Sequence, residues 1–214
     1  MALIALDERL KFPPPEMADE DGLLAIGGDL SRERLLLAYR SGIFPWYENK
    51  YILWWCPDPR FILIPEELRI SSSMKQLLKK NYFDFSIDTD FKGVISNCRA
   101  ISRRGQEGTW ITDEMRDAYC DLHQSGYAHS AEIKLNGKLV GGLYGVRMGN
   151  IFFGESMFSL VSNASKYAFI SYVQYLKDTG VKLIDCQVYT THLESLGAKM
   201  ISRSAFLQSV KTLQ

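Results

Sequence analysis

Three polar residues in the second half of the sequence have the types and spacing for chemistry: Glu155, Asp185 and Gln187. Glu155 lies in an apolar stretch that begins at Ile151 and predicts a β-strand. Asp185 and Gln187 stand two residues apart in a second predicted strand, residues 182–187, so their side chains share one face. If the two strands are neighbours, two carboxyl groups and an amide converge on one patch. Such a patch is typical of the ligand crevice of an open sheet, and its carboxyl groups are candidates for acid–base work.

The segment between these strands predicts the helix that positions them. Ser162 or Asn163 is a suitable N-cap, and Thr179-Gly180 is a suitable end. Between them, apolar residues recur at the spacing of one helix face: Ala164, Ala168, Phe169, Tyr172, Val173 and Leu176. A strand–helix–strand unit usually forms a parallel pair of strands through a right-handed crossover. We therefore expect Glu155 and Asp185 on adjacent strands.

Structural roles compete with this interpretation. A single glutamate in an apolar strand is more often salt-bridged or at a strand edge than catalytic. It is the combination of Glu155 with Asp185 and Gln187 that favours a functional site. Cys186 could act as a nucleophile, but strand alternation predicts that it faces away from Asp185.

Composition excludes several classes of protein. The 214 residues suffice for one large domain or two small ones, and 46% hydrophobic residues with 12% aromatic residues indicate a folded globular chain. Lys+Arg and Asp+Glu are both 25, so nucleic-acid binding would need a local patch. Four cysteines without a C-x-x-C pair and three scattered histidines predict no zinc site. With no signal peptide and no apolar run of about 18 residues, a reduced cytoplasmic protein is the simplest interpretation.

The first half is dense in proline and aromatic residues. Residues 1–30 are expected to be irregular, followed by a short helix that Ser31 caps and that ends near Gly42. The segment 42–60 contains Trp46, which either packs in a core or forms a stacking platform for a base.

A basic helix and a mixed set of strands follow. Residues 71–80 predict a helix whose lysines most simply form a solvated face; they are Lys75, Lys79 and Lys80. Asn136-Gly137 between two strand-like runs is a strong signal for a two-residue hairpin. The second half is therefore predicted to run helix, hairpin, strand, helix, strand, helix, strand, which resembles the GNAT N-acetyltransferase architecture. Residues 162–166 lack the glycines that would let a backbone approach coenzyme A pyrophosphate, so a different acyl donor is expected.

A series of short motifs runs in order over nearly the whole chain. In the first half they are Phe12-Pro-Pro-Pro, Gly22-Leu-Leu-Ala-Ile-Gly-Gly-Asp, Gly42-Ile-Phe-Pro-Trp-Tyr, Trp54-Trp-Cys-Pro-Asp-Pro-Arg and Gly108-Thr-Trp-Ile-Thr. In the second half they are Gly141-Gly-Leu-Tyr-Gly, Gly154-Glu-Ser-Met-Phe-Ser, Asn163-Ala-Ser-Lys, Leu183-Ile-Asp-Cys-Gln and Ser195-Leu-Gly-Ala. This pattern resembles the leucyl/phenylalanyl-tRNA–protein transferase family.

The resemblance implies a function, partners and a fold. Members move Leu, Phe or Met from charged tRNA to the N-terminal Arg or Lys of a protein, which marks that protein for degradation by the bacterial N-degron pathway. They need neither a metal nor coenzyme A. The implied fold is α/β (α+β): a small aromatic and proline-rich N-terminal domain over residues 1–62, and a GNAT-like domain with a mixed β-sheet over residues 63–214.

The resemblance also assigns roles to residues. Asp185 and Gln187 match the proposed catalytic pair and Glu155 the active-site glutamate, so Asp185 is expected to attract the cationic peptide terminus and to orient Gln187. Trp46 and Trp110 match tryptophans near the terminal adenosine of the tRNA. The pocket for the transferred side chain corresponds to Leu143, Phe152, Met157, Phe169, Tyr172 and Leu176. The tRNA-binding helix is left with Lys75, Lys79 and Lys80, because relatives often carry arginine where this chain has Ser72 and Gln76.

Three other functions stay open at this level. A coenzyme A-dependent N-acetyltransferase would share the fold but not the composition of residues 162–166. A non-catalytic RNA-binding protein would share the aromatic residues and lysines but would not need two carboxyl groups beside an amide. A peptidoglycan-type aminoacyl-tRNA transferase would differ in its acceptor.

Overall fold

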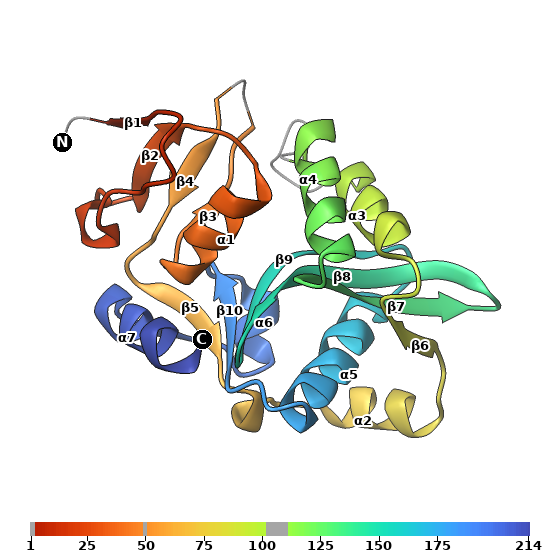
Figure 1. Cartoon of the computed structure of the whole chain (residues 1–214). Helices are drawn as coiled ribbons and strands as arrows, with labels where there is room; N and C mark the ends of the chain where they lie inside the picture. Colours follow the sequence, from red (N-terminus) through yellow and green to blue (C-terminus); the bar gives the residue numbers. More distant parts are fainter. Residues whose placement is uncertain (1–2, 49–50, 102–110) are drawn as a thin grey trace.

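The computed structural model describes residues 3–48, 51–101 and 111–214 (Figure 1). Its N-terminal part holds a four-stranded sheet in the order β1-β2-β4-β3. These strands are β1 (Ile4–Leu6), β2 (Leu23–Gly27), β3 (Phe44–Pro45) and β4 (Leu53–Trp55). The expectation of irregular structure over residues 1–30 is wrong for β1 and β2. The apolar run of β2 pairs with a strand on either side and buries Leu24 and Ala25.

Helix α1 (Arg32–Arg40) follows the small sheet's second strand and confirms the predicted helix. The Ser31 hydroxyl accepts a hydrogen bond from the backbone N–H of Arg34 at 3.4 Å, as an N-cap does. Gly42 lies just beyond the helix with φ +71°, and a side chain there would meet Leu207 of the C-terminal helix at 2.7 Å. Glycine at this position thus allows both the left-handed turn after α1 and the close approach of the C-terminal helix.

The larger sheet has seven strands in the order β11-β5-β10-β9-β8-β7-β6. Their bounds are β5 (Arg60–Leu63), β6 (Asp84–Ile87), β7 (Ala128–Leu135), β8 (Lys138–Met148), β9 (Ile151–Ser159), β10 (Leu183–Gln187) and β11 (Lys199–Ile201). Asn136 and Gly137 join β7 to β8 with φ angles of 52° and 74°, which confirms the predicted hairpin turn. All pairs in this sheet are antiparallel except β9 with β10, so the sheet is mixed.

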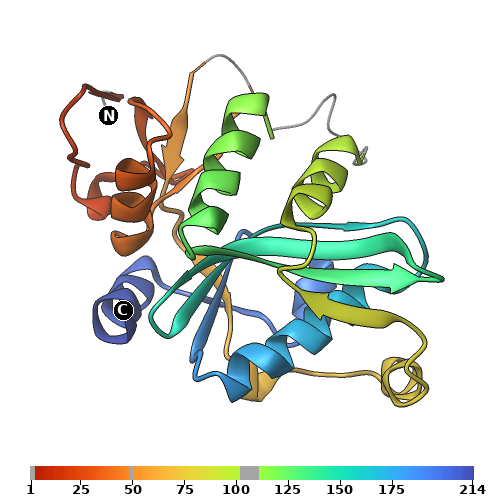
Figure 2. The same ribbon diagram turned by 45° about the vertical axis from the view of Figure 1, so that its right-hand side comes forward.

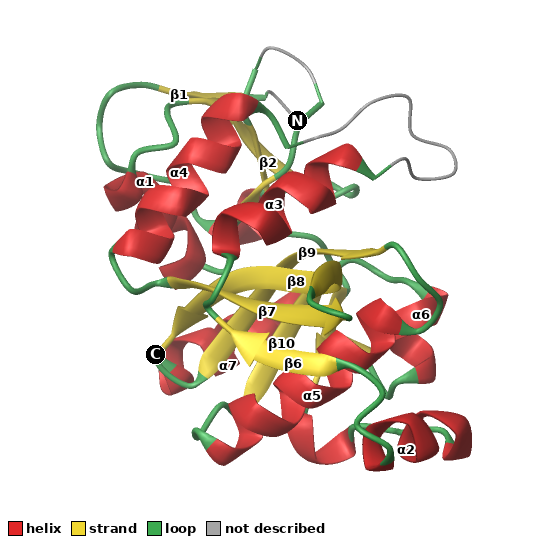
Figure 3. Cartoon of the chain, turned by 90° about the vertical axis from the view of Figure 1, so that its right-hand side faces the viewer, coloured by secondary structure: helices red, strands yellow, loops and turns green. Residues whose placement is uncertain are grey.

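Helices cover both faces of the larger sheet (Figures 1 to 3). The helices α3 (Phe91–Ala100) and α4 (Asp113–Gln124) lie on the same side as the small sheet, and α2 (Ser72–Lys79) and α5 (Ala164–Asp178) lie on the other. The remaining helical elements are α6 (Thr191–Ser195), α7 (Arg203–Leu213) and the short 3₁₀ turns η1 (Pro15–Met17) and η2 (Pro65–Glu67). Thr112 caps α4 through its hydroxyl, as its sequence position predicts.

The predicted strand–helix–strand unit is β9, α5 and β10. The two strands are parallel, with Phe152 opposite Ile184 and Phe153 opposite Asp185. Asn163 occupies the N-cap position of α5, but its backbone is left-handed with φ 68° and its side chain makes no capping hydrogen bond. The predicted side-chain cap is therefore wrong, although the boundary of the helix is right. Pairing of β9 with β10 stops at Phe153, while β9 continues to Ser159.

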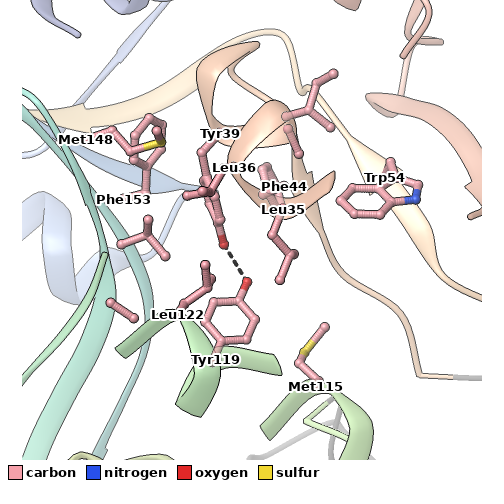
Figure 4. Close-up of a cluster of buried hydrophobic side chains, with 14 of the residues drawn as sticks. Leu35, Leu36, Tyr39, Phe44, Trp54, Met115, Tyr119, Leu122, Met148 and Phe153 are labelled. Carbon is pink, nitrogen blue, oxygen red and sulfur yellow. Dashed lines mark hydrogen bonds between the residues drawn. The ribbon is translucent and has the colours of Figure 1, made fainter. Parts of the chain in front are cut away.

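The core is divided into two clusters. The first cluster joins the small sheet and α1 to α3 and α4, and it includes Trp54, Tyr39 and Tyr119 (Figure 4). The second cluster packs α5 against the other face of the larger sheet. The proposed domain boundary after residue 62 falls inside β5, and all of β5 pairs within the larger sheet.

Candidate active site

Glu155 lies at the centre of a group of hydrogen bonds from three separate elements. Its Oε1 accepts from the Tyr39 hydroxyl and from Gln187 Nε2, both at 2.8 Å, and its Oε2 accepts from the Tyr119 hydroxyl at 3.0 Å. The two tyrosine hydroxyls also lie within hydrogen-bonding distance of each other, and they face one another from α1 and α4 (Figure 4). Because each hydroxyl carries one proton, the two tyrosines can donate only two of these three contacts at once. The side-chain amide of Gln187 is therefore held in one orientation by the carboxyl group.

Burial gives Glu155 an unusual acidity. Removal from water disfavours the ionised carboxylate and raises its pKa to about 7, and the negative charge of Asp185 adds to this. Hydrogen bonds from Tyr39, Tyr119 and Gln187 act in the opposite direction by stabilising the charge. The carboxyl group can therefore change its protonation state near neutral pH.

Asp185 is bound by an arginine rather than open to solvent. Arg60 Nε and Nη2 donate to its two carboxylate oxygens at 2.8 and 2.7 Å, and both side chains are fully buried. The Arg60 guanidinium lies between two aromatic rings, 4.7 Å from the centroid of Phe44 and 4.4 Å from that of Phe206. Both carboxylate oxygens of Asp185 are thus occupied by Arg60, whose positive charge offsets the attraction expected between this carboxylate and a cationic peptide terminus.

The backbone between Asp185 and Gln187 departs from a regular strand. The register of β10 with β5 shifts between these residues, and Gln187 has a left-handed φ of 63°. The Asp185 carboxylate accepts the backbone N–H of Gln187 at 2.9 Å, which stabilises this conformation. Cys186 packs with the second core cluster, whereas Ile62 and Phe153, the residues opposite Asp185, belong to the first, so Cys186 faces away from Asp185 as predicted.

A cavity of about 350 Å³ opens beside these groups. Of the six residues predicted to shape the donor pocket, four line it: Leu143, Phe152, Met157 and Phe169. Tyr172 and Leu176 are buried but do not line the cavity, and Tyr172 packs edge-on against Phe152 with ring centroids 5.1 Å apart. The rest of the wall comes from Tyr144 of β8, from residues 154–156 of β9, and from β10 and the segment after it, including Ile184, Val188, Thr190, His192 and Leu193.

The residues predicted to bind tRNA lie away from the cavity wall. Trp46 is 37% exposed on the small sheet, next to Trp55 at 5.7 Å between ring centroids, and is not part of the cavity lining. Trp110 lies outside the described residues.

The three lysines form a surface of their own. Lys75, Lys79 and Lys80 are all exposed at helix α2, which lies on the opposite side of the larger sheet from the small sheet, whose strand β3 ends just before Trp46 (Figures 1 and 2). The structure therefore does not bring the lysines and this tryptophan together into one patch.

Sequence reasoning missed three members of the site. Tyr39 and Tyr119 occupy apolar faces of their helices, where a buried tyrosine gives no signal of its partner. Arg60 did carry a signal, because a charged residue at the start of the apolar run Arg60-Phe-Ile-Leu has to find a partner if the strand is buried.

Two further features were sought among the described residues: clusters of metal-ligating side chains and helices that could cross a membrane. Among them, no group of three or more His, Cys, Asp or Glu side chains could hold a metal ion. No helix in the described part of the chain has the length and apolar character to cross a bilayer.

The mixed α/β fold places an acid–amide cluster beside a largely apolar cavity, an arrangement that suits an acyltransferase. The sequence matches a family model described as leucyl/phenylalanyl-tRNA protein transferase over residues 62–211, and the N-terminal domain of the same proteins over residues 28–58. The chain belongs to the leucyl/phenylalanyl-tRNA–protein transferase family of aminoacyltransferases, which confirms the resemblance seen in its motifs.

Individual relatives show how far the similarity extends. The leucyl/phenylalanyl-tRNA–protein transferase of Flavobacterium johnsoniae is 57% identical over 204 residues, 95% of this chain and 96% of that protein. The protein of the same name from Pseudomonas putida strain W619 is 56% identical over 202 residues, 93% of this chain and 89% of that protein. Among solved structures, that of FemX is similar in fold, with a TM-score of 0.55 at 11% identity over 85% of this chain and 71% of the other.

Proposed function

We propose that this protein transfers leucine, phenylalanine or methionine from charged tRNA to the N-terminal Arg or Lys of other proteins in the cytoplasm. The modified proteins would then be degraded through the N-degron pathway. The observation that supports this most is the Glu155–Gln187 pair at the wall of a cavity whose lining is otherwise largely apolar. An apolar cavity suits aromatic donor side chains and aliphatic ones that are not branched at Cβ, and the adjacent polar pair suits an amine and an ester carbonyl.

The reaction is the attack of a free α-amine on an aminoacyl ester. Gln187 can hold the amine through its side-chain carbonyl oxygen, because Glu155 already fixes the amide nitrogen at 2.8 Å. Asp185 and its partner Arg60 keep the backbone of Gln187 in the required conformation. Asp185 acts here through Gln187 and not by direct contact with the peptide.

Selection of the donor takes place in the cavity. Met157 and Phe169 line it from β9 and α5, and Met157 can adjust its shape to either a leucyl or a benzyl group. A β-branched side chain carries its bulk next to the backbone, so Ile and Val are expected to fit poorly. The tRNA itself is expected to contact Trp46, Trp110 and the lysines of α2.

One assay tests the proposal. The purified chain is incubated with radiolabelled Leu-tRNA or Phe-tRNA and a peptide that begins with Arg, and the label in the peptide is measured. The same peptide with an acetylated N-terminus is the matched control for the free α-amine. We expect labelling of the free peptide only. Transfer of acetyl from acetyl-coenzyme A, with none from aminoacyl-tRNA, would contradict the proposal.

A further inference from the structure

Glu155 and the two tyrosines beside it form a closed group of three side chains, which we call the acid–tyrosine ring. When Glu155 is ionised, Tyr39 can donate to its Oε1 at 2.8 Å and Tyr119 to its Oε2 at 3.0 Å. The two hydroxyls also lie within hydrogen-bonding distance of each other (Figure 4). Both tyrosines are fully buried, whereas Glu155 is partly exposed and lines the cavity. The ring therefore joins the cavity to the packed hydroxyls of α1 and α4.

The ring has one proton too few when Glu155 is ionised. Its three contacts need three protons, and the two hydroxyls supply only two. A proton on Oε2 would supply the third, because Oε2 can then donate to Tyr119, Tyr119 to Tyr39, and Tyr39 to Oε1. Uptake of a single proton therefore completes the hydrogen bonding of the ring.

Glu155 also has an open position at which a proton can arrive. A carboxylate offers about four lone-pair positions. Its Oε1 accepts from Tyr39 and Gln187, whereas Oε2 accepts from Tyr119 alone among the described residues. Under the proposed function, the carbonyl oxygen of Gln187 holds the acceptor amine. That oxygen shares a carbon atom with the nitrogen that Glu155 binds, so the amine lies next to the Glu155 carboxyl group.

We propose that the acid–tyrosine ring takes up the proton of the acceptor's α-ammonium group, with Glu155 as the catalytic base and Tyr39 and Tyr119 as positioning residues. This inference rests on the proposed function. The proton moves from nitrogen to Oε2, and rotation about the C–O bond turns it toward Tyr119. The electron pair left on nitrogen forms the new C–N bond. The ester C–O bond breaks, and the ribose oxygen leaves with a second proton from the same nitrogen. The ring then returns its proton to water, so protons and electrons balance.

The charges around the ring suit this role. The titratable and charged groups that surround it come from α1, α4, β5, β8 and β10, and they are Tyr39, Tyr119, Arg60, Tyr144 and Asp185. Burial, with a smaller contribution from the charge of Asp185, raises the pKa of Glu155 to about 7. An α-amino group has a pKa of about 7.7–8.0. Transfer of a proton from the amine to this carboxylate is therefore nearly balanced in free energy, which suits general-base catalysis.

The pH dependence of Glu155→Gln tests the base. Its amide can make the same three ring contacts as a protonated carboxyl group and can still accept from Gln187, but it cannot take up a proton. We expect kcat/KM for the Arg peptide to fall by about 100-fold at about pH 7. The loss should shrink above about pH 8.5, where the α-amine of the free peptide has already lost its proton. A loss of equal size at every pH would show that Glu155 only holds Gln187 in place and would overturn the proposal.

Replacement of each tyrosine tests the ring. Tyr39→Phe and Tyr119→Phe each remove a hydroxyl that stabilises the carboxylate, so each should raise the pKa of Glu155. The limb of the pH profile that belongs to Glu155 should then move to higher pH, while the limb of the acceptor amine stays in place. Tyr167→Phe is the matched control, because Tyr167 is a buried tyrosine of α5 that packs against Phe83, and it should move neither limb.

Infrared difference spectra give a reading that needs no transfer reaction. The spectrum of the unmodified protein minus that of Glu155→Gln reports protonation of this one carboxyl group. Its midpoint should rise in Tyr39→Phe and in Tyr119→Phe, and one folded variant is sufficient because the two hydroxyls belong to different helices. A midpoint and a pH limb that both stay in place would remove the tyrosines from the mechanism.

Failure of this inference can be distinguished from failure of the proposed function. His192 also lines the cavity. A loss in His192→Gln that disappears when the acceptor amine is already deprotonated, with no loss in Glu155→Gln, would assign the base to His192 and overturn the proposal. Absence of any transfer by the unmodified protein would contradict the proposed function itself, whereas the infrared titration would still report on the ring.

Discussion

Arg60 and Asp185 form a buried, two-fold hydrogen-bonded ion pair 125 residues apart in the sequence, with N–O distances of 2.8 and 2.7 Å. The same carboxylate accepts the backbone N–H of Gln187. The arginine is in turn packed between Phe44 of the small sheet and Phe206 of α7. The position of the Gln187 amide therefore depends on contacts from both ends of the chain.

A single and a double substitution in this pair should differ in their effect on stability but not in their effect on transfer. Asp185→Ala leaves a buried guanidinium without its counter-charge and should lower the free energy of unfolding by about 3–5 kcal/mol. The double variant Arg60→Met/Asp185→Leu removes both charges and should recover most of that loss, as apolar replacements of buried pairs often do. Transfer should stay low in both, because neither holds the Gln187 backbone. Urea unfolding and the peptide-labelling assay measure the two effects, and full activity in the double variant would disprove the positioning role.

The raised pKa of Glu155 predicts a pH dependence of stability. Its pKa is about 7 in the folded protein against 4.5 for the free side chain, so the unfolded chain releases this proton more readily. The contribution of protonated Glu155 to the free energy of unfolding is complete below pH 4.5 and is lost as the pH rises to about 7. The loss is on the order of 3 kcal/mol.

Comparison with Glu155→Gln isolates this contribution. The side chain of the variant cannot ionise. The free energy of unfolding of the unmodified protein minus that of the variant should therefore fall as the pH rises from 4.5 to 7, and it should be constant above that range. Denaturant titrations at a series of pH values measure it. A pH-independent difference would show that the carboxyl group is not destabilised by burial.

The cavity predicts how donor selection responds to a change of shape. Met157→Trp should lower transfer of Phe more than that of Leu, because the indole fills depth that a benzyl group needs. Phe169→Ala removes part of the wall and should weaken both. The exposed Met200 on β11 gives a matched control, Met200→Trp, that should change neither. Each charged tRNA is assayed separately with one Arg peptide; an equal loss for both donors would place Met157 outside the donor pocket.

The exposed lysines of α2 predict a salt-sensitive interaction with tRNA. Replacement of Lys75, Lys79 and Lys80 by alanine should weaken tRNA binding and flatten the dependence of log K on log salt concentration, since fewer counterions are released. Replacement of three other exposed lysines, Lys177, Lys182 and Lys211, removes the same charge elsewhere and should leave the slope nearly unchanged. Equal slopes for both triple variants would place the tRNA on another surface.

Local sequence signals were sufficient to predict most of the helices and strands. Ser31, Thr112 and the Asn136-Gly137 turn mark boundaries that the structure confirms, because capping and turn formation depend only on neighbouring residues. The parallel β9–β10 pair followed from the strand–helix–strand pattern. The short strands of the first 30 residues were missed because their pairing partners are not marked in the local sequence.

The site was predictable only in part for the same physical reason. The proximity of Glu155 to Gln187 follows from adjacent strands, and four of the six residues that the family resemblance implied for the pocket line the cavity. The partners Tyr39, Tyr119 and Arg60 reach the site through tertiary packing, which no local pattern records. The backbone shift at Gln187 is likewise set by the carboxylate of Asp185 and not by propensity.

The residues that bind Glu155 are far apart in the sequence, which has a consequence for when the site forms during protein synthesis. Tyr39, Tyr119 and Gln187 lie 116, 36 and 32 residues from Glu155 in the sequence, and Phe206 must dock against Arg60 as well. On the ribosome, a chain that ends before β10 contains the residues of the small sheet and α1. It lacks the Gln187 amide, and it lacks Phe206, one of the two rings that pack against Arg60. Transfer activity should therefore arise only after α7 has left the exit tunnel.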